Sequence, residues 1–173
     1  MQLQLPWLAY PVIRMLDKRE INGATDVLEL GGGGSTFYFA KRGAKVTCFE
    51  TNPDWAEKIA EGCRELRLDN VELNLFAFDY AVAEAPEKYR MMEKMKTGRH
   101  DIILVDICDH NSLHRPELFH IAETIVKPGG IIILDDSHRY PQIRENNNAG
   151  NWRTYKAIGP ARPDLAHTDV YFY

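Results

Sequence analysis

The stretch LELGGGGSTFYFA, residues Leu28–Ala40, places four consecutive glycines between a short apolar run and the first turns of a predicted helix. A glycine-rich turn between a strand and a helix lets the backbone approach a ligand closely, because no Cβ intervenes. In sheets built from alternating strands and helices, ligands bind beyond the carboxyl ends of the strands, near the point where the strand order reverses. The glycine run is therefore the first candidate for a binding site.

Short runs rich in β-branched residues alternate with helical patterns on both sides of this turn. The expected strands are residues 26–30, 45–50, 71–78, 101–107 and 130–136. Several of these runs are apolar at consecutive positions, which is typical of a strand covered on both faces. Two aromatic-rich runs, residues 152–159 and 168–173, predict an antiparallel pair at the edge of the sheet. The sequence therefore predicts an α/β fold: a Rossmann-like three-layer sandwich with a mostly parallel seven-stranded sheet and a C-terminal antiparallel hairpin.

Length and composition exclude several classes of protein. The 173 residues are expected to form a single domain, residues 1–173, with an ordinary globular composition of 45% hydrophobic and 27% charged residues. A net charge of -4 gives no overall basic field for binding nucleic acid. The N-terminus predicts neither a signal peptide nor a membrane span. Three cysteines, which cannot all pair with one another, favour a reduced cytoplasmic location.

Two classes of cofactor use a glycine turn of this kind. A dinucleotide site of the G-x-G-x-x-G type needs a third glycine where Thr36 stands. S-adenosylmethionine has no phosphate, and it needs a close backbone together with acidic groups for its ammonium and ribose hydroxyls. Glu29 stands two residues before Gly31. Glu50 stands about twenty residues beyond the turn, a spacing that suits the ribose of either cofactor.

Five segments in order, between roughly residues 24 and 137, resemble the class I S-adenosylmethionine-dependent methyltransferases. LELGGGGS resembles the first motif of the family, acid-x-Gly-x-Gly-x-Gly, with Glu29, Gly31 and Gly33 in place and Ser35 replacing the last glycine. VTCFETN is similar to the second strand of the family and carries Glu50, at the position that holds the ribose hydroxyls.

The other three segments extend the resemblance towards the C-terminus. LFAFDYA resembles the segment in which an acid, here Asp79, contacts the adenine amino group, with Phe78 beside it. DIILVDICD is similar to the fourth strand with Asp106 at its tip, and VKPGGIIILDDS resembles the turn into the fifth strand. The resemblance implies an enzyme that uses S-adenosylmethionine to methylate a small molecule, on oxygen rather than nitrogen. The implied cofactor-binding residues are Glu29, Gly31, Gly33, Ser35, Glu50, Phe78, Asp79 and Asp106.

Acidic residues after the fourth and fifth strands resemble the metal site of a subgroup, the catechol-type O-methyltransferases. Asp106, Asp135 and Asp136 match the positions that hold a divalent cation there. Oxygen ligands suit Mg²⁺, which could lower the pKa of a bound hydroxyl and orient it. Alternatively, Asp106 and Asp135 shape the cofactor cleft, and Asp136 or Ser137 caps the next helix.

The catalytic candidates are His110, Asp106 and His138. The lysine base that the subgroup carries shortly after the fourth strand is absent, and His110 or His114 stands in that loop. The pKa of histidine suits proton transfer near neutrality, and a hydroxyl acceptor must lose its proton.

The features of the acceptor are indicated only broadly. A chain with little beyond its core domain favours a small-molecule substrate, with no nucleic acid or membrane partner. Loop arginines suggest an acceptor with a carboxylate, phosphate or sugar hydroxyls. They are Arg115, Arg139 and Arg144. The N-terminal residues, with Trp7 and Tyr10, either close over the acceptor or cover the sheet edge, and the second alternative is favoured.

Other assignments stay open from the sequence. A homodimer is compatible with it. The chain could be a catalytically silent S-adenosylmethionine-binding module, because the expected lysine is missing. An NAD-dependent oxidoreductase is disfavoured by Thr36 at the third glycine position.

Overall fold

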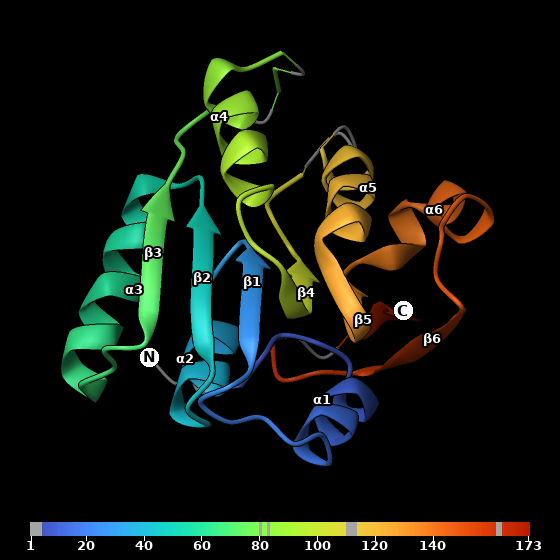
Figure 1. Ribbon diagram of the computed structural model, residues 1–173, viewed down its shortest axis with the longest axis horizontal. Coiled ribbons are helices and arrows are strands. Elements are labelled where there is room, and N and C mark those ends of the chain that lie inside the picture. Colours follow the sequence, from blue (N-terminus) through green and yellow to red (C-terminus); the bar gives the residue numbers. More distant parts are fainter. Residues whose placement is uncertain (1–4, 80, 83, 110–113, 162–163) are drawn as a thin grey trace.

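The computed structural model describes residues 5–79, 81–82, 84–109, 114–161 and 164–173 (Figure 1). The helices are α1 (Tyr10–Asp17), α2 (Gly34–Lys41), α3 (Pro53–Leu66), α4 (Pro86–Met95), α5 (Arg115–Ile125), the 3-10 turn η1 (Ser137–Arg139) and α6 (Pro141–Glu145). The strands are β1 (Asp26–Leu30), β2 (Lys45–Glu50), β3 (Val71–Leu75), β4 (His100–Val105), β5 (Val126–Leu134), β6 (Asn151–Ile158) and β7 (Leu165–Phe172).

The strands form one seven-stranded sheet in the order β3-β2-β1-β4-β5-β7-β6. The pairs from β3 to β5 are parallel, and β7 pairs antiparallel with both β5 and β6. The predicted fold class and its C-terminal hairpin are confirmed. The strand order reverses between β1 and β4, so the carboxyl ends of these two strands flank the position where such folds bind ligands.

Helices cover both faces of the sheet because successive strand residues point to opposite sides. Val27 of β1 packs in a core with α1, α2 and α3, whereas Leu28 packs in a second core with α4, α5 and α6. α1 packs on the first face through Val12, Ile13 and Leu16, where it contacts the edge strand β6. The favoured prediction, that N-terminal residues cover the sheet edge, is therefore confirmed for α1.

The element that follows β2 begins as the sequence predicts. The Asn52 side chain accepts a hydrogen bond from the Trp55 main-chain N–H at 3.0 Å, and Pro53 occupies the first turn of α3. The cap satisfies a donor that the helix leaves unpaired, and proline needs no donor there. This start fixes the direction in which the first turn of α3 faces the glycine run.

Several predicted strand boundaries are wrong by two to four residues. The third strand ends at Leu75 rather than at residue 78. The Pro/Gly segment was expected to separate helix α5 from the fifth strand, but β5 begins at Val126 and residues 127–130 loop out of it as an irregularity. The irregularity is fixed by pairing with the C-terminal residue, because Gly129 N donates to Tyr173 O and Tyr173 N donates to Gly130 O.

The three thiols are free: Cys48 is buried, and Cys63 and Cys108 are partly exposed. No helix within the described ranges is both long enough and apolar enough to cross a membrane.

Candidate functional site

The glycine run forms a tight turn at the carboxyl end of β1. Gly31 has φ +90°, which side chains other than glycine rarely adopt, and its N–H donates to Phe49 O of β2 at 2.8 Å. A Cβ at this position would lie 2.7 Å from the carbonyl oxygen of Asp106. Glycine is therefore required at position 31 mainly because the end of β4 lies so close to the end of β1. This close contact forms the bottom of the cleft.

Glu50 ends β2 beside this turn. One carboxylate oxygen accepts from the main-chain N–H groups of Thr51 at 2.7 Å and Asn52 at 2.9 Å, and the other accepts from Gly32 N–H at 3.1 Å. The side chain is 5% exposed, yet it lines the cavity of the cleft. An ionised carboxylate has about four acceptor sites, so an oxygen held in this way can still accept a hydroxyl from a ligand.

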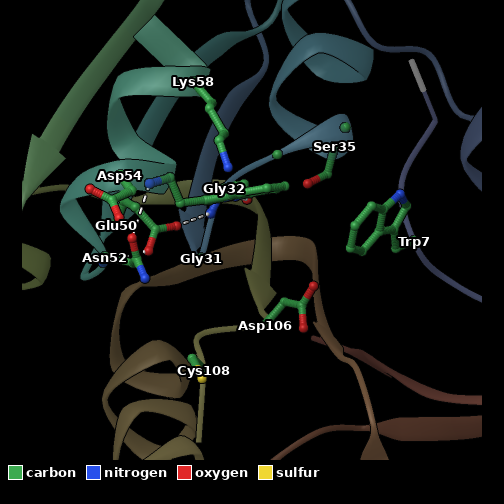
Figure 2. Close-up of a pocket in the computed structure, with 13 residues that line it drawn as sticks. Trp7, Gly31, Gly32, Ser35, Glu50, Asn52, Asp54, Lys58, Asp106 and Cys108 are labelled. Atoms are coloured by element: carbon green, nitrogen blue, oxygen red, sulfur yellow. Dashed lines mark hydrogen bonds between the residues drawn. The ribbon is translucent and has the colours of Figure 1, made fainter. Parts of the chain in front are cut away.

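A cavity of about 520 Å³ opens at the carboxyl ends of β1, β2 and β4 (Figure 2). This volume falls within the range of small-molecule sites, roughly 300–1,000 Å³. The residues that line it are Trp7, Gly31, Gly32, Gly33, Gly34, Ser35, Glu50, Asn52, Asp54, Trp55, Lys58, Asp106 and Cys108. Five predicted binding residues are thus brought together: Gly31, Gly33, Ser35, Glu50 and Asp106.

Two tryptophans border the cavity, and neither has a role that the sequence motifs predict. Trp55, in the first turn of α3, donates its indole N–H to Gly32 O at 2.7 Å, and Lys58 Nζ lies 5.3 Å from its ring centroid. The centroids of the Trp7 and Trp55 rings are 6.1 Å apart, with a 54° angle between the planes. Trp55 could have been found from the sequence by its position, which is three residues after the Asn52 cap and five residues after Glu50.

Asp106 forms an ion pair with a buried arginine. Arg115 Nη2 lies 3.0 Å from Asp106 Oδ1, and the Arg115 side chain is 4% exposed. Arg115 also donates to the carbonyl oxygens of Ile107 at 2.7 Å and Asp135 at 2.6 Å, which ties the ends of β4 and β5 together. Burial raises the pKa of Asp106 to about 6, and the charge of Arg115 offsets only part of this rise.

The predicted magnesium ligands lie near one another but have other partners. Asp135 is 4% exposed and accepts from the Thr168 hydroxyl at 2.8 Å, and burial together with the charge of Asp106 raises its pKa well above the usual range. Asp136 follows with φ 49° and precedes η1 without a side-chain cap. Within the described part of the chain, no group of three histidine, cysteine or acidic residues is arranged to hold a metal.

Glu29 lies beneath the glycine turn rather than in the cavity. It is fully buried, and among the described residues neither of its carboxylate oxygens has a hydrogen-bond partner of good geometry. Burial raises its pKa to about 7, and the nearby hydroxyls of Thr36 and Ser35 lower the pKa only in part. Glu29 is not among the residues that line the cavity, and its predicted contact with the cofactor stays a prediction.

The remaining predicted site residues lie outside the cavity lining. Phe78 is half-buried against the second core, with its ring edge to face with that of His114 at 5.4 Å. Asp79 is exposed and accepts from the Ala81 main-chain N–H at 2.9 Å. His138 is exposed and lies 4.6 Å from the His167 ring. His110 falls outside the described residues.

All three loop arginines make contacts within the protein. Arg139 Nη2 donates to the carbonyl oxygen of Asp109, and Arg144 Nε donates to the buried Asp169 carboxylate at 2.7 Å. Arg115 holds the floor of the cleft as described above. None of the three lines the cavity, so these arginines do not support the prediction of a carboxylate or phosphate on the acceptor.

Comparisons with solved structures agree with this fold. The chain is similar to an rRNA methylase from Streptococcus thermophilus, with a TM-score of 0.68, 12% sequence identity and coverage of 94% of this chain and 95% of that one. It is also similar to the O-methyltransferase TomG from Streptomyces achromogenes in complex with S-adenosylmethionine, with a TM-score of 0.63, 16% identity and coverage of 86% and 73%. No family model and no curated protein matches the sequence. At these identities the likeness establishes the Rossmann-like fold that the two methyltransferases share.

Proposed function

We propose that this protein is an S-adenosylmethionine-dependent methyltransferase that acts on a small molecule. The observation that carries the proposal is the Glu50 carboxylate, held by three main-chain N–H groups beside the glycine turn, inside a cavity at the point where the strand order reverses. A carboxylate held this way is preorganised to accept the two hydroxyls of a ribose.

The chemistry of the cavity fits an adenosyl sulfonium better than a dinucleotide. Glu50, Asp54 and Asp106 line the cavity and Lys58 is the cation among its described lining residues, so the balance of charge favours a cationic ligand. A pyrophosphate would bring two negative charges to this place. In addition, Thr36 occupies the position of the third glycine of a dinucleotide site, where its hydroxyl accepts from Gly33 N–H at 2.9 Å.

We infer the following division of work among the residues. Glu50 and Asn52 hold the ribose end, and the glycine turn supports the amino-acid end of the cofactor. Asp106 faces the reacting groups from the end of β4 and takes the proton of the acceptor hydroxyl. The bound cofactor supplies the methyl group: its carbon–sulfur bond breaks, a carbon–oxygen bond to the acceptor forms, and the sulfur leaves as a neutral thioether. Positioning accounts for most of the rate, because the displacement needs an in-line approach.

Calorimetric titration with S-adenosylhomocysteine, S-adenosylmethionine and NADH tests the proposal. We expect the first two to bind and Glu50→Ala to weaken S-adenosylhomocysteine binding about hundredfold, since two hydrogen bonds to a charged group are lost. Glu57→Ala, at an exposed position of α3, is the matched control and should leave the affinity unchanged. Binding of NADH alone would overturn the proposal. Titrations with EDTA and with Mg²⁺ test separately whether Asp106, Asp135 and Asp136 hold a metal.

A further inference from the structure

The two edge strands of the sheet are built differently. β3, at one edge, is five residues long, and its Glu72 pairs with Lys94 of α4 at 3.4 Å. β6, at the other edge (Figure 1), is eight residues long and stays in unbroken register with β7 from Asn151 to Ile158. An edge strand presents unpaired N–H and C=O groups, and many proteins protect it by shortness, a proline or a bulge. β6 has none of these three features between its ends, so its outer side can pair with another strand.

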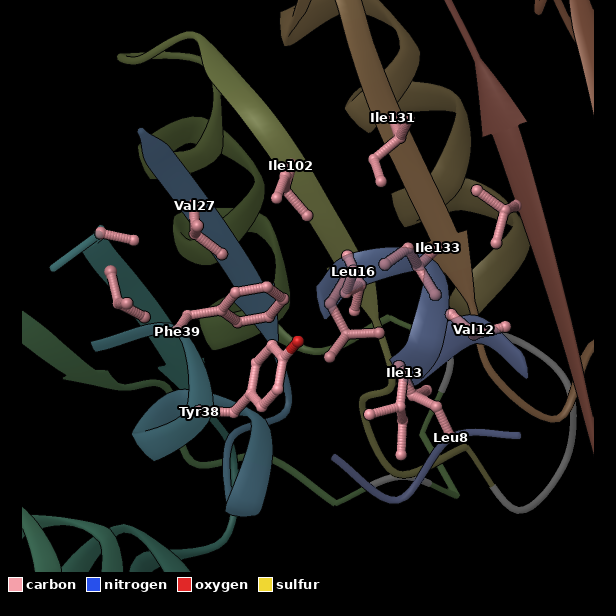
Figure 3. Packing of buried hydrophobic residues seen from close by; sticks show 14 of the residues in the cluster. Leu8, Val12, Ile13, Leu16, Val27, Tyr38, Phe39, Ile102, Ile131 and Ile133 are labelled. Carbon is pink, nitrogen blue, oxygen red and sulfur yellow. The ribbon is translucent and has the colours of Figure 1, made fainter. Parts of the chain in front are cut away.

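α1 occupies the first face of the sheet beside this edge. Figure 3 shows Val12 and Leu16 of α1 in one cluster with Ile133 of β5, and α1 also contacts β6 itself. Tyr155 and Ala157 of β6 pack against the same core. The odd-numbered positions of β6 therefore face α1, and the even-numbered positions point to the opposite face of the sheet.

Three exposed apolar side chains lie on that opposite face of the hairpin. Trp152 and Ile158 stand near the two ends of β6, and Leu165 of β7 is directly opposite Ile158. Trp152 is 37% exposed, Ile158 is 55% exposed and Leu165 is 49% exposed. Large apolar side chains that remain uncovered along an edge strand favour contact with another apolar surface.

A second copy of β6 supplies such a surface. In an antiparallel pair, directly opposed residues point to the same side of the sheet, so a symmetric pair of identical strands is centred on one residue that opposes itself. Centring on Tyr155 places Trp152 of each copy opposite Ile158 of the other, with Leu165 beside them. Pairs of an aromatic and a β-branched residue stabilise antiparallel strands, and this register forms two of them by symmetry.

The charges of the strand disfavour the neighbouring registers. Centring on Arg153 or on Lys156 would place like charges directly opposite each other, which destabilises a strand pair. Centring on Thr154 would separate the apolar residues at the two ends of the strand. With Tyr155 at the centre, Arg153 is opposite Ala157 and Lys156 is opposite Thr154, so no cation opposes another directly. Registers centred nearer the ends of the strand pair fewer residues.

We propose that the chain forms a symmetric homodimer in which the β6 strands of two copies pair antiparallel around Tyr155. Main-chain hydrogen bonds along residues 152–158 join the two sheets into one, and the contacts between Trp152 and Ile158 fix the register. An interface of this size predicts a dissociation constant on the order of 10 µM. No described residue of β6 lines the cavity, so the inference does not rest on the proposed function.

Sedimentation velocity of the full chain, between about 1 and 100 µM, tests the association. Salt at about 0.3 M screens the repulsion between the two Lys156 side chains, which lie on a diagonal across the pair. Ile158→Lys should weaken the dimer about tenfold or more, because it removes both apolar contacts and brings a cation towards Arg144, which lies over the Trp152 ring. Leu75→Lys, the same change at an exposed position of β3, is the matched control and should leave the association unchanged.

Cross-linking tests the register. Position 155 opposes itself in the proposed pair, within reach of a disulfide bond. Position 153 of one copy lies about 14 Å from position 153 of the other, because four residues separate them along the strand. Mild oxidation should therefore cross-link Tyr155→Cys but not Arg153→Cys. The unmodified protein, whose three thiols are free, gives the background, and melting temperatures show that each variant is folded.

Each outcome supports or overturns the inference. A dimer that Ile158→Lys weakens, that Leu75→Lys leaves unchanged and that cross-links through position 155 supports it. A chain that stays monomeric up to about 100 µM overturns it. A dimer that is equally stable in folded Ile158→Lys, or that cross-links as readily through position 153, also overturns it, because the two copies then meet elsewhere or in another register.

Discussion

At the ends of β1 and β2, the Glu50 carboxylate is held by three main-chain N–H groups, whereas at the ends of β4 and β5 a single side chain, that of Arg115, holds the structure together. The turn itself supplies these main-chain donors, so no single side-chain substitution removes them. The second half depends on one buried guanidinium that bonds to Ile107, Asp106 and Asp135. The half that carries the proposed ribose site is thus held by the backbone, and the half that carries the proposed acceptor site is held by a side chain.

The largest expected effect comes from removing that guanidinium. Arg115→Met should lower the free energy of unfolding by about 3–5 kcal/mol, because the partly buried carboxylate of Asp106 loses its partner and the carbonyl groups of Asp106, Ile107 and Asp135 lose a buried donor. Urea denaturation measures this change. Arg90→Met is the control, since Arg90 is exposed and pairs with Glu87 on the surface of α4, and it should cost less than about 1 kcal/mol. Equal effects of the two changes would contradict the contrast between the halves.

The second prediction concerns the buried carboxyl of the half that is held by the backbone. The pKa of Glu29 is raised to about 7 in the folded protein against 4.5 for an ordinary glutamate. The folded state therefore binds this proton more tightly than the unfolded state. The contribution to stability is fully present below pH 4.5 and is lost as the pH rises through about 7.

Glu29→Gln removes that titration. Between pH 4.5 and 8 the unmodified protein should lose about 3 kcal/mol of unfolding free energy more than the variant does. Unfolding curves at intervals across this range give the difference in unfolding free energy between the two proteins. The titrations of Asp106 and Asp135 contribute equally to both proteins and therefore cancel. Glu61→Gln, at an exposed position of α3, should reproduce the unmodified profile. If the unfolding free energies of Glu29→Gln and of the unmodified protein change in parallel with pH, then burial does not raise the pKa of Glu29.

The smallest expected effect compares two glycines with positive φ. Gly31→Ala and Gly129→Ala both force alanine into the left-handed region, at φ +90° and +79°. At Gly31 the new methyl also meets the Asp106 carbonyl, whereas no atom lies within 4 Å of the corresponding position at Gly129. We expect Gly129→Ala to cost about 1 kcal/mol and Gly31→Ala at least about 1 kcal/mol more. Thermal unfolding of both variants measures the difference in stability. Equal losses of stability would mean that the end of β4 shifts to make room for the new methyl group at position 31.

Features that depend on residues close together in the chain could be predicted from the sequence. The alternation of apolar runs and helical patterns gave the layers and the hairpin, because burial on both faces of a sheet leaves a periodic record. The Asn52–Pro53 start of α3 is likewise a local signal. Gly31, Gly33 and Glu50 could be placed at one site because the ends of neighbouring parallel strands meet at one edge of a sheet.

The remaining roles could not be predicted, because they depend on contacts between segments that are distant in the sequence. Whether Arg115 faces solvent or ties β4 to β5 is decided by the meeting of two strand ends, and its sequence context is that of an ordinary loop arginine. Glu29 matches a binding motif, yet it is fully buried and does not line the cavity. Trp7 lies 99 residues from Asp106 along the chain, and the two line the same cavity because the N-terminal segment docks across the end of α2. Local pattern carries no information on such a contact, since the free energy that fixes it comes from the packing of the whole domain.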